Sequence, residues 1–188
     1  MTEAELRAAG PQDAAQVAQL HAESWRRTYR GAYADSYLDG DLVADRLAVW
    51  SARLAAPHGT LTLVAEDGAG LAGFVHLVLD EDDRWGTLVD NLHVRHDRKR
   101  GGLGRTLLSG AAAAAAVDAV HRSLYLWVHA QNTAAQGFYS ALGGRNVGTA
   151  PVAAPGGLPE RLNGTPEKYR FAWSEAALLG RAAVAPAG

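Results

Sequence analysis

Basic side chains and glycines are concentrated in one short stretch of the chain, between residues 95 and 105. An alanine-rich segment that favours a helix follows, so the cations lie where that helix begins. A helix N-terminus carries roughly half a positive charge and unpaired N–H groups, and cations there are unfavourable unless an anion shares the site. Glycines leave such N–H groups open to a ligand. The pattern predicts a pyrophosphate cradle formed by Arg95, Arg98, Lys99, Arg100 and Arg105 together with Gly101, Gly102 and Gly104.

Three segments must position this turn. Residues 88–94 are apolar at the positions typical of a largely buried strand. Residues 103–117 combine leucines at helical spacing with a run of six alanines and predict a helix. Residues 124–128 are apolar and β-rich, which predicts a second buried strand. A strand, a helix and a strand in this order imply a parallel crossover.

Two common phosphate-binding loops fail on spacing. A P-loop requires Lys followed by Ser or Thr after its last glycine, but Gly104 is followed by Arg105 and Thr106. The dinucleotide-binding fingerprint requires a third glycine where Leu107 stands.

The turn resembles the acyl-CoA signature of the GNAT superfamily of N-acetyltransferases. In that signature a strand valine, here Val94, is followed five positions later by Gln or Arg and then by x-x-Gly-x-Gly, here ending in Gly102 and Gly104. Lys99 stands at the position of the family's Gln or Arg, and His96 stands where the family often has Pro. Neither departure removes a backbone donor.

Residues 130–144 are similar to the second GNAT motif. Asn132 is placed to cap a helix, Phe138 and Tyr139 form the aromatic pair inside it, and Leu142 with the glycines after it closes it. The family has an aromatic where Gly144 stands, which concerns packing and no catalytic position. Two motifs in the expected order, separated by one strand, are much more specific than either motif alone.

The resemblance implies an α/β GNAT-like acyl-CoA N-acyltransferase fold, with a mixed, mostly antiparallel sheet and helices on both faces. It implies acetyl-CoA as cosubstrate, with one main-chain N–H near Leu92 or Val94 polarising the thioester carbonyl. Tyr139 occupies the family's general-acid position; the alternative is an ordinary half-buried helix tyrosine. The residues implied in cofactor binding are Leu92, Val94, Lys99, Arg100, Gly101, Gly102, Leu103, Gly104, Arg105 and Asn132.

Asp90 is the candidate general base. It lies four residues before Val94, where several family members have a carboxylate or histidine that acts through water. Strand alternation predicts that Asp90 shares a face with Leu92 and Val94. A carboxylate is a weak base for an ammonium of pKa near 10, so this role requires a raised pKa or a water chain, and a structural hydrogen-bonding role is the alternative.

Composition limits the other classes. A chain of 188 residues with 48% hydrophobic content suits one domain, expected at residues 1–174 with a tail at 175–188. A net charge of −2 argues against a nucleic-acid partner. The chain has no cysteine, which excludes thiolate metal sites and a cysteine acyl-enzyme, and His93 and His96 have no third ligand nearby, so no metal is expected. No signal pattern or apolar run of ~20 residues predicts a membrane partner, and we expect a cytoplasmic protein.

The remaining segments follow from periodicity. We expect strands at 5–9, 60–66, 71–79, 145–149 and 168–173, the last pairing with the one before it, and helices after Asp13 and over 42–54. Residues 80–83 form an acidic, solvated loop and 151–166 a loop rich in Gly and Pro. The aromatic residues that either pack the first helix on the sheet or line an acceptor pocket are Trp25, Tyr29, Tyr33 and Tyr37.

The sequence thus predicts an acetyl-CoA-dependent N-acetyltransferase that transfers acetyl directly to a primary amine of a small molecule, peptide or protein. The rival class is a non-catalytic acyl-CoA-binding module. The presence of both Asn132 and Tyr139 favours the enzyme. The identity of the amine and the oligomeric state, with a homodimer among the options, are not fixed by the sequence.

Overall fold

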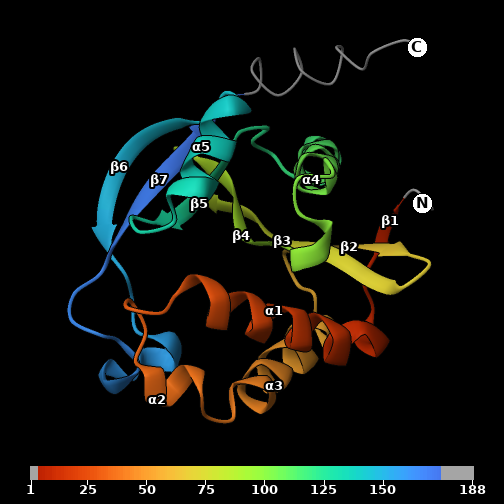
Figure 1. Cartoon of the computed structure of the whole chain (residues 1–188). Helices are drawn as coiled ribbons and strands as arrows, with labels where there is room; N and C mark the ends of the chain where they lie inside the picture. The colour runs from red at the N-terminus through yellow and green to blue at the C-terminus, as the bar shows by residue number, and fades with distance from the viewer. Residues whose placement is uncertain (1–3, 175–188) are drawn as a thin grey trace.

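The computed structural model describes residues 4–174, and the predicted tail at 175–188 lies outside them. A seven-stranded sheet forms the centre of the molecule (Figure 1). Its strands are β1 (Glu5–Ala8), β2 (Thr60–Asp67), β3 (Gly70–Asp82), β4 (Gly86–Val94), β5 (Leu124–His129), β6 (Arg145–Pro151) and β7 (Glu167–Trp173). The helices are α1 (Ala14–Thr28), α2 (Asp35–Leu38), α3 (Leu42–Ala55), α4 (Leu103–Asp118) and α5 (Thr133–Ala141). Short 3₁₀ turns lie at η1 (Pro11–Asp13), η2 (His96–Arg98), η3 (Pro155–Gly157) and η4 (Pro159–Arg161).

The strand order is β1-β2-β3-β4-β5-β7-β6, and every neighbouring pair is antiparallel except β4 and β5. This confirms the predicted mixed sheet with one parallel crossover through α4. The last strand, β7, pairs with β6 as expected, but it also inserts between β6 and β5. Pattern in the sequence gave no indication of that insertion.

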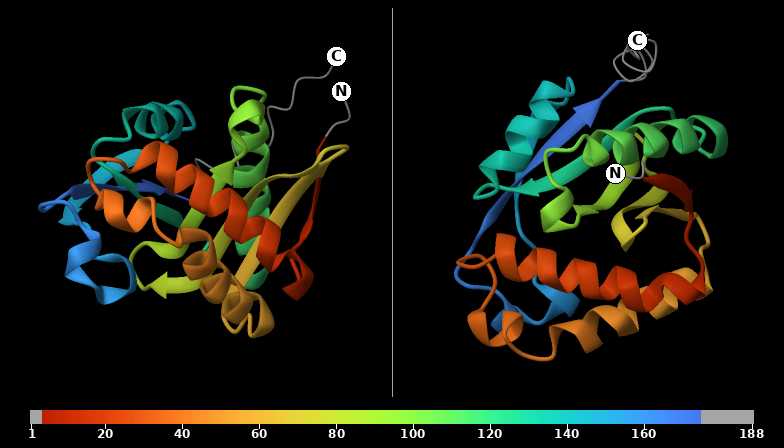
Figure 2. Two further views of the ribbon diagram at one scale, coloured as in Figure 1. Left: turned by 60° about the horizontal axis from the view of Figure 1, so that its bottom comes forward. Right: turned by 45° about the vertical axis from the view of Figure 1, so that its right-hand side comes forward.

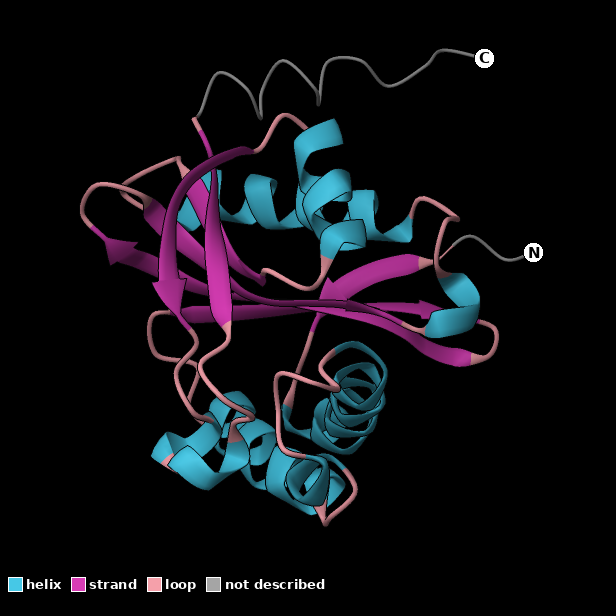
Figure 3. Ribbon diagram, turned by 60° about the vertical axis from the view of Figure 1, so that its left-hand side comes forward, coloured by secondary structure: helices cyan, strands magenta, loops and turns pink. Residues whose placement is uncertain are grey.

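Helices cover both faces of the sheet, with α4 and α5 on one side and α1, α2 and α3 on the other (Figures 2 and 3). Successive side chains along each strand point to opposite faces of the sheet, so one strand packs against both helix layers. On β2 and β3, Val64 and Phe74 are buried under α1 and α3, whereas Ala65 and Val75 belong to the core under α4.

The parallel pair in the middle of the sheet is short. β4 and β5 pair only at Thr87 with Leu124 and at Leu88 with Tyr125, and beyond these residues the two strands diverge without pairing. The Arg95 N–H donates to the Ala72 carbonyl on the β3 side at 2.8 Å. Because main-chain groups alternate between the two edges of a strand, the N–H and C=O groups of Val94 and Leu92 point into the gap. The gap therefore presents unpaired strand edges to a ligand.

A bulge in β4 borders this gap. His76 is opposite Asn91 and Leu77 is opposite Val89, so Asp90 has no partner on β3. An extra residue in one strand disrupts simple alternation and redirects the side chains around it.

The bulge places Asp90 on the α3 side of the sheet, where its carboxylate forms an ion pair with Arg53 at 2.9 Å. Leu92 and Val94 instead pack against the core under α4. The prediction that Asp90 shares a face with these two residues is therefore wrong, because it assumed an unbroken two-residue period.

Three local features also differ from what the sequence predicts. The predicted acidic loop at 80–83 is largely the end of β3, and the Asp80 carboxylate accepts the N–H groups of Val120 and His121, each at 2.8 Å, just beyond α4. Asp13 precedes α1 but makes no capping bond to it; its carboxylate binds Arg7 and the Gly10 N–H. The four-residue helix α2 was not predicted, since one turn gives no usable periodicity.

Candidate active site

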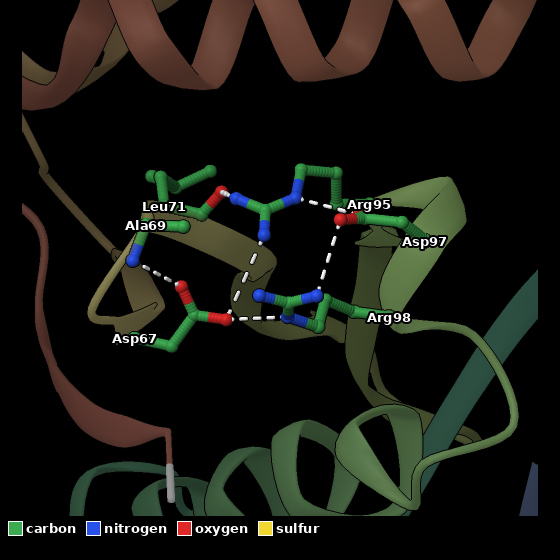
Figure 4. A network of polar contacts seen from close by, with 6 residues as sticks. All are labelled: Asp67, Ala69, Leu71, Arg95, Asp97 and Arg98. Atoms are coloured by element: carbon green, nitrogen blue, oxygen red, sulfur yellow. Dashed lines mark hydrogen bonds and ion pairs between the residues drawn. The ribbon is translucent and has the colours of Figure 1, made fainter. Parts of the chain in front are cut away.

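The basic turn divides into two groups of cations. Arg95 and Arg98 join Asp67 and Asp97 in an ion-pair network that ties the turn to the β2–β3 hairpin (Figure 4). The Arg98 Nε donates to Asp67 Oδ2 at 2.5 Å, and this bond lowers the pKa of Asp67. The network corrects the prediction that all five cations serve an anion, because these two already have carboxylate partners.

The second group consists of Lys99, Arg100 and Arg105, which form no ion pair within residues 4–174. They flank the start of α4. Within residues 4–174, the backbone N–H groups of residues 100–104 have no hydrogen-bond acceptor. Gly102, the residue before α4, has φ of 85°, a left-handed conformation that favours glycine. A Cβ added there would meet no atom within 4 Å, so this concave backbone faces open space.

The other predicted turn residues have separate local roles. Gly104 lets α4 approach α5, because a Cβ there would lie 3.2 Å from Phe138 Cζ. The Leu103 side chain is buried in the α4 core, so only its main chain borders the turn. Gly101 has a negative φ, and a Cβ there would make one ordinary contact with Arg98.

Asn132 lies at the start of α5, beside the end of β5. Its Oδ1 accepts the Ala135 N–H at 3.2 Å, which confirms the predicted cap. Its side-chain Nδ2 donates to no group within residues 4–174.

Tyr139 is buried inside α5. Its ring contacts Phe171 and, edge-on, Trp173, with centroids 6.0 and 5.9 Å apart. Its hydroxyl makes no hydrogen bond with any other described residue. Burial raises the pKa of Tyr139 above its usual value, so the phenol keeps its proton at physiological pH and is available as a donor.

Aromatic side chains form a wall on the other side of the gap. Tyr29 stacks on His129 at the end of β5, with ring centroids 4.2 Å apart, and Trp25 contacts Tyr33 at 5.0 Å. The Tyr33 hydroxyl lies 3.4 Å from His129 Nε2. Burial lowers the pKa of His129 to about 4, so the ring is neutral at pH 7. A pocket of about 310 Å³ opens next to this wall, lined by His129, Gly31, Gln131 and Glu167 among others.

His93 and His96 have different surroundings. The His93 Nδ1 is 2.8 Å from the Ser24 hydroxyl, and burial lowers the pKa of His93 to about 4. His96 begins the η2 turn. Among the residues that the structure describes, no group of three or more His, Asp or Glu side chains is arranged to hold a metal ion, and no helix is long and apolar enough to cross a membrane.

Residues 16–143 match the family model described as the acetyltransferase (GNAT) family. The chain belongs to this family. Comparison with curated proteins gives no match.

Solved GNAT structures share the fold. A GCN5-related N-acetyltransferase from Rhodopseudomonas palustris is similar with a TM-score of 0.70 and 22% identity, over 93% of this chain and 97% of that one. PaiA N-acetyltransferase from Thermoplasma acidophilum, in complex with coenzyme A, has a TM-score of 0.67 and 19% identity over 90% and 99%. YncA from Salmonella typhimurium, with acetyl-CoA, has a TM-score of 0.65 and 20% identity over 93% and 95%. The predicted GNAT fold is confirmed.

Two groups in this GNAT site were missed by sequence reasoning. His129 ends β5 and faces the aromatic wall, and its only sequence signal is a polar residue closing an apolar strand. Arg53 pairs with Asp90 across 37 positions of the chain, and spacing on α3 alone does not reveal that partner.

Proposed function

We propose that this GNAT protein is an acetyl-CoA-dependent N-acetyltransferase that transfers acetyl directly to a primary amine. The observation that carries the proposal is the meeting of two features at the end of β4. The gap between β4 and β5 presents unpaired main-chain groups, and an open glycine backbone lies beside it at the α4 N-terminus, where N–H groups lack acceptors and three cations lack ion pairs within residues 4–174. A long ligand with an anionic end and an amide-bearing arm suits this combination.

The chain's residues fit coenzyme A. The N–H groups of residues 100–104, with Lys99, Arg100 and Arg105, would bind the pyrophosphate. The main chains of Leu92 and Val94 would pair with the pantetheine arm, and Asn132 would border it through Nδ2, which donates to no group within residues 4–174. When bound, acetyl-CoA supplies an activated thioester.

Tyr139 and Asp90 would then move the protons. The amine nitrogen forms a bond to the carbonyl carbon while the carbon–sulfur bond breaks. The Tyr139 hydroxyl gives its proton to the departing sulfur, and the amine loses one proton through water toward Asp90. A main-chain N–H in the gap would stabilise the charge that develops on the carbonyl oxygen.

Direct transfer is supported by the chain's composition. Cysteine is the side chain best suited to accept acetyl from a thioester, and the chain has none. Both substrates must then be bound together, with catalysis coming largely from their positioning. Intact mass after incubation with acetyl-CoA alone tests this point: an acetyl adduct that an amine discharges at the rate of turnover would contradict direct transfer.

The rival function is a GNAT-like module that binds acyl-CoA without turnover. The Tyr139 hydroxyl has no hydrogen-bond partner within residues 4–174, which favours the enzyme, since a purely structural buried tyrosine usually donates to a partner. We propose an amine acceptor as the partner, with neither nucleic acid nor membrane, and a cytoplasmic location. A homodimer stays a prediction.

Two measurements test the proposal. Acetyl-CoA should raise the melting temperature of the wild-type protein, and Gly102→Glu should remove this shift, because its side chain would enter the anion site. Release of free CoA should then depend on an added amine. Binding without amine-dependent CoA release across amines, amino acids and peptides would favour the rival module, and no thermal shift at millimolar acetyl-CoA would refute both functions.

A further inference from the structure

Two arginines on α3 lie beside the proposed base, Asp90, and the aromatic wall. Arg46 and Arg53 are seven residues apart, which is two helical turns, so they lie on one side of the helix about 10 Å apart. Arg53 reaches Asp90 on β4. Arg46 therefore faces the same side, and its guanidinium lies over the Trp25 ring with Cζ 4.5 Å from the centroid.

Arg46 is unusual because it is a buried cation with little compensation. The residue is 8% exposed. Its Nε and Nη2 both donate to Asp45 Oδ2, at 3.1 and 2.6 Å, and no other described residue accepts from it. The same Asp45 carboxylate also pairs with Arg161 at 3.1 Å and accepts the Tyr37 hydroxyl. One carboxylate shared by two arginines leaves one positive charge, and burying such a charge is costly unless a ligand compensates it.

A second cation faces the same aromatic wall. Lys168 is directly opposite His129 in the β5–β7 ladder, so their side chains share a face. Its Nζ lies 4.6 Å from the centroid of the Trp127 ring, and it forms no ion pair within residues 4–174. Contacts run continuously along the wall, since Trp25 touches Tyr33 and Tyr33 touches His129. The wall thus has a cation at each end.

We propose that the acceptor is an amine that also carries a carboxylate, such as a free α-amino acid, with the carboxylate bound by Arg46 and the amine directed toward Asp90. This inference rests on the proposed acetyl transfer at the same site. A planar guanidinium matches a carboxylate with paired hydrogen bonds. The Arg53–Asp90 pair is neutral overall. Arg46 and Lys168 outnumber the Glu167 carboxylate that lines the neighbouring pocket, so the walls are net positive and a polyamine with additional ammonium groups is repelled.

The first test uses the wild-type protein and matched acceptors. Each of a panel of α-amino acids is compared with its carboxamide and its decarboxylated amine, alongside spermidine and short peptides with amidated C-termini. We expect kcat/KM for the best acid to exceed that of its amide and amine by about 10- to 100-fold, the scale of one charge-assisted interaction. Equal use of amides, or preference for spermidine or peptides, overturns the proposal.

Binding provides a readout that does not need turnover. With saturating CoA present, the best acid should raise the melting temperature further, and its amide should not. Absence of any acid-selective shift and of any acid-selective turnover overturns this inference. The shift caused by CoA alone reports on the proposed function separately, so the two can fail independently.

Substitutions then assign the selectivity to Arg46. Arg46→Gln should raise KM for the acid about 10- to 100-fold, with KM for acetyl-CoA and for the amide unchanged, and Arg46→Lys should recover part of the loss. Arg27→Gln, at an exposed position on α1, is the matched control and should behave as wild type. Equal loss for acid and amide would make Arg46 structural and overturn the proposal. If Arg46→Gln does not fold, Arg46→Lys and the wild-type panel decide.

Discussion

Replacing Tyr139 by Phe removes a single hydroxyl and separates a catalytic role from a packing role. The hydroxyl makes no hydrogen bond with another described residue, and the ring keeps its contacts with Phe171 and Trp173. The free energy of unfolding should therefore change by no more than about 0.5 kcal/mol. As the proposed donor to the departing sulfur, however, the hydroxyl contributes to the transition state. We expect kcat to fall by about 10²-fold or more, with KM for acetyl-CoA little changed.

Tyr125→Phe is the matched control, with the opposite pattern. The buried Tyr125 donates its hydroxyl to Glu81, away from the diverging part of β4 and β5. Its loss should cost about 1 kcal/mol of stability, because a hydrogen bond to a charged group disappears, and should leave kcat unchanged.

The assay measures urea unfolding and steady-state CoA release for both variants with one good acceptor. Because burial raises the pKa of Tyr139, its proton stays bound at neutral pH, and the variant's rate deficit should be constant between about pH 6 and 9. A Tyr139→Phe variant with wild-type kcat and reduced stability would refute the reasoning and leave Tyr139 as a core residue.

Three further outcomes are expected. Asp90→Asn should lower kcat by about 10-fold or more with KM for acetyl-CoA unchanged, measured by CoA release, and an unaltered kcat would leave Asp90 a structural role in its contacts with Arg53 and Asn91. Gly102→Ala should destabilise the protein by about 1–2 kcal/mol, because it forces a side chain into a left-handed backbone. Gly137→Ala should stabilise it by about 1 kcal/mol, because this glycine lies inside α5 with open space around the added Cβ. Urea unfolding measures both changes, and reversed signs would contradict the assigned conformations. Burial lowers the pKa of His76 and His129 to about 4, so between that pH and about 6.5 the unfolded chain binds protons that the folded state does not. The free energy of unfolding should therefore fall as pH decreases from about 6.5 to 4, by up to about 1.4 kcal/mol per pH unit for each histidine. Chemical unfolding across that window checks the sign.

The local elements were within reach of the sequence because they depend on local physics. Helical periodicity and alanine propensity predicted α4, and Asn132 predicted the start of α5. The glycines of the turn predicted the open backbone at Gly102, because glycine is the residue that most readily adopts the left-handed conformation found there. Two motifs with their spacing were sufficient for the family, which the match over residues 16–143 confirms.

Pairing between distant residues was decided only by the tertiary structure. Asp97 is a local partner of Arg95 and Arg98, but nothing near them in the sequence indicates that Asp67, from the β2–β3 hairpin, joins it, while the other three cations form no ion pair within residues 4–174. The bulge at Asp90 depends on the register of β3 against β4. One extra residue there moves a carboxylate to the other face of the sheet, which no two-residue pattern can anticipate.

The acceptor side illustrates the same division most clearly. The sequence identified Trp25, Tyr29 and Tyr33 as aromatics near a helix end, but either packing or pocket lining was compatible with their spacing. Folding brings His129 from β5 against them, with Lys168 at its side, and α3 brings Arg46 over Trp25. The sequence determines which side chains are present and, where an element is regular, which face of it they occupy. Their common surface, and its net positive charge, exist only because long-range packing brings four separate segments together.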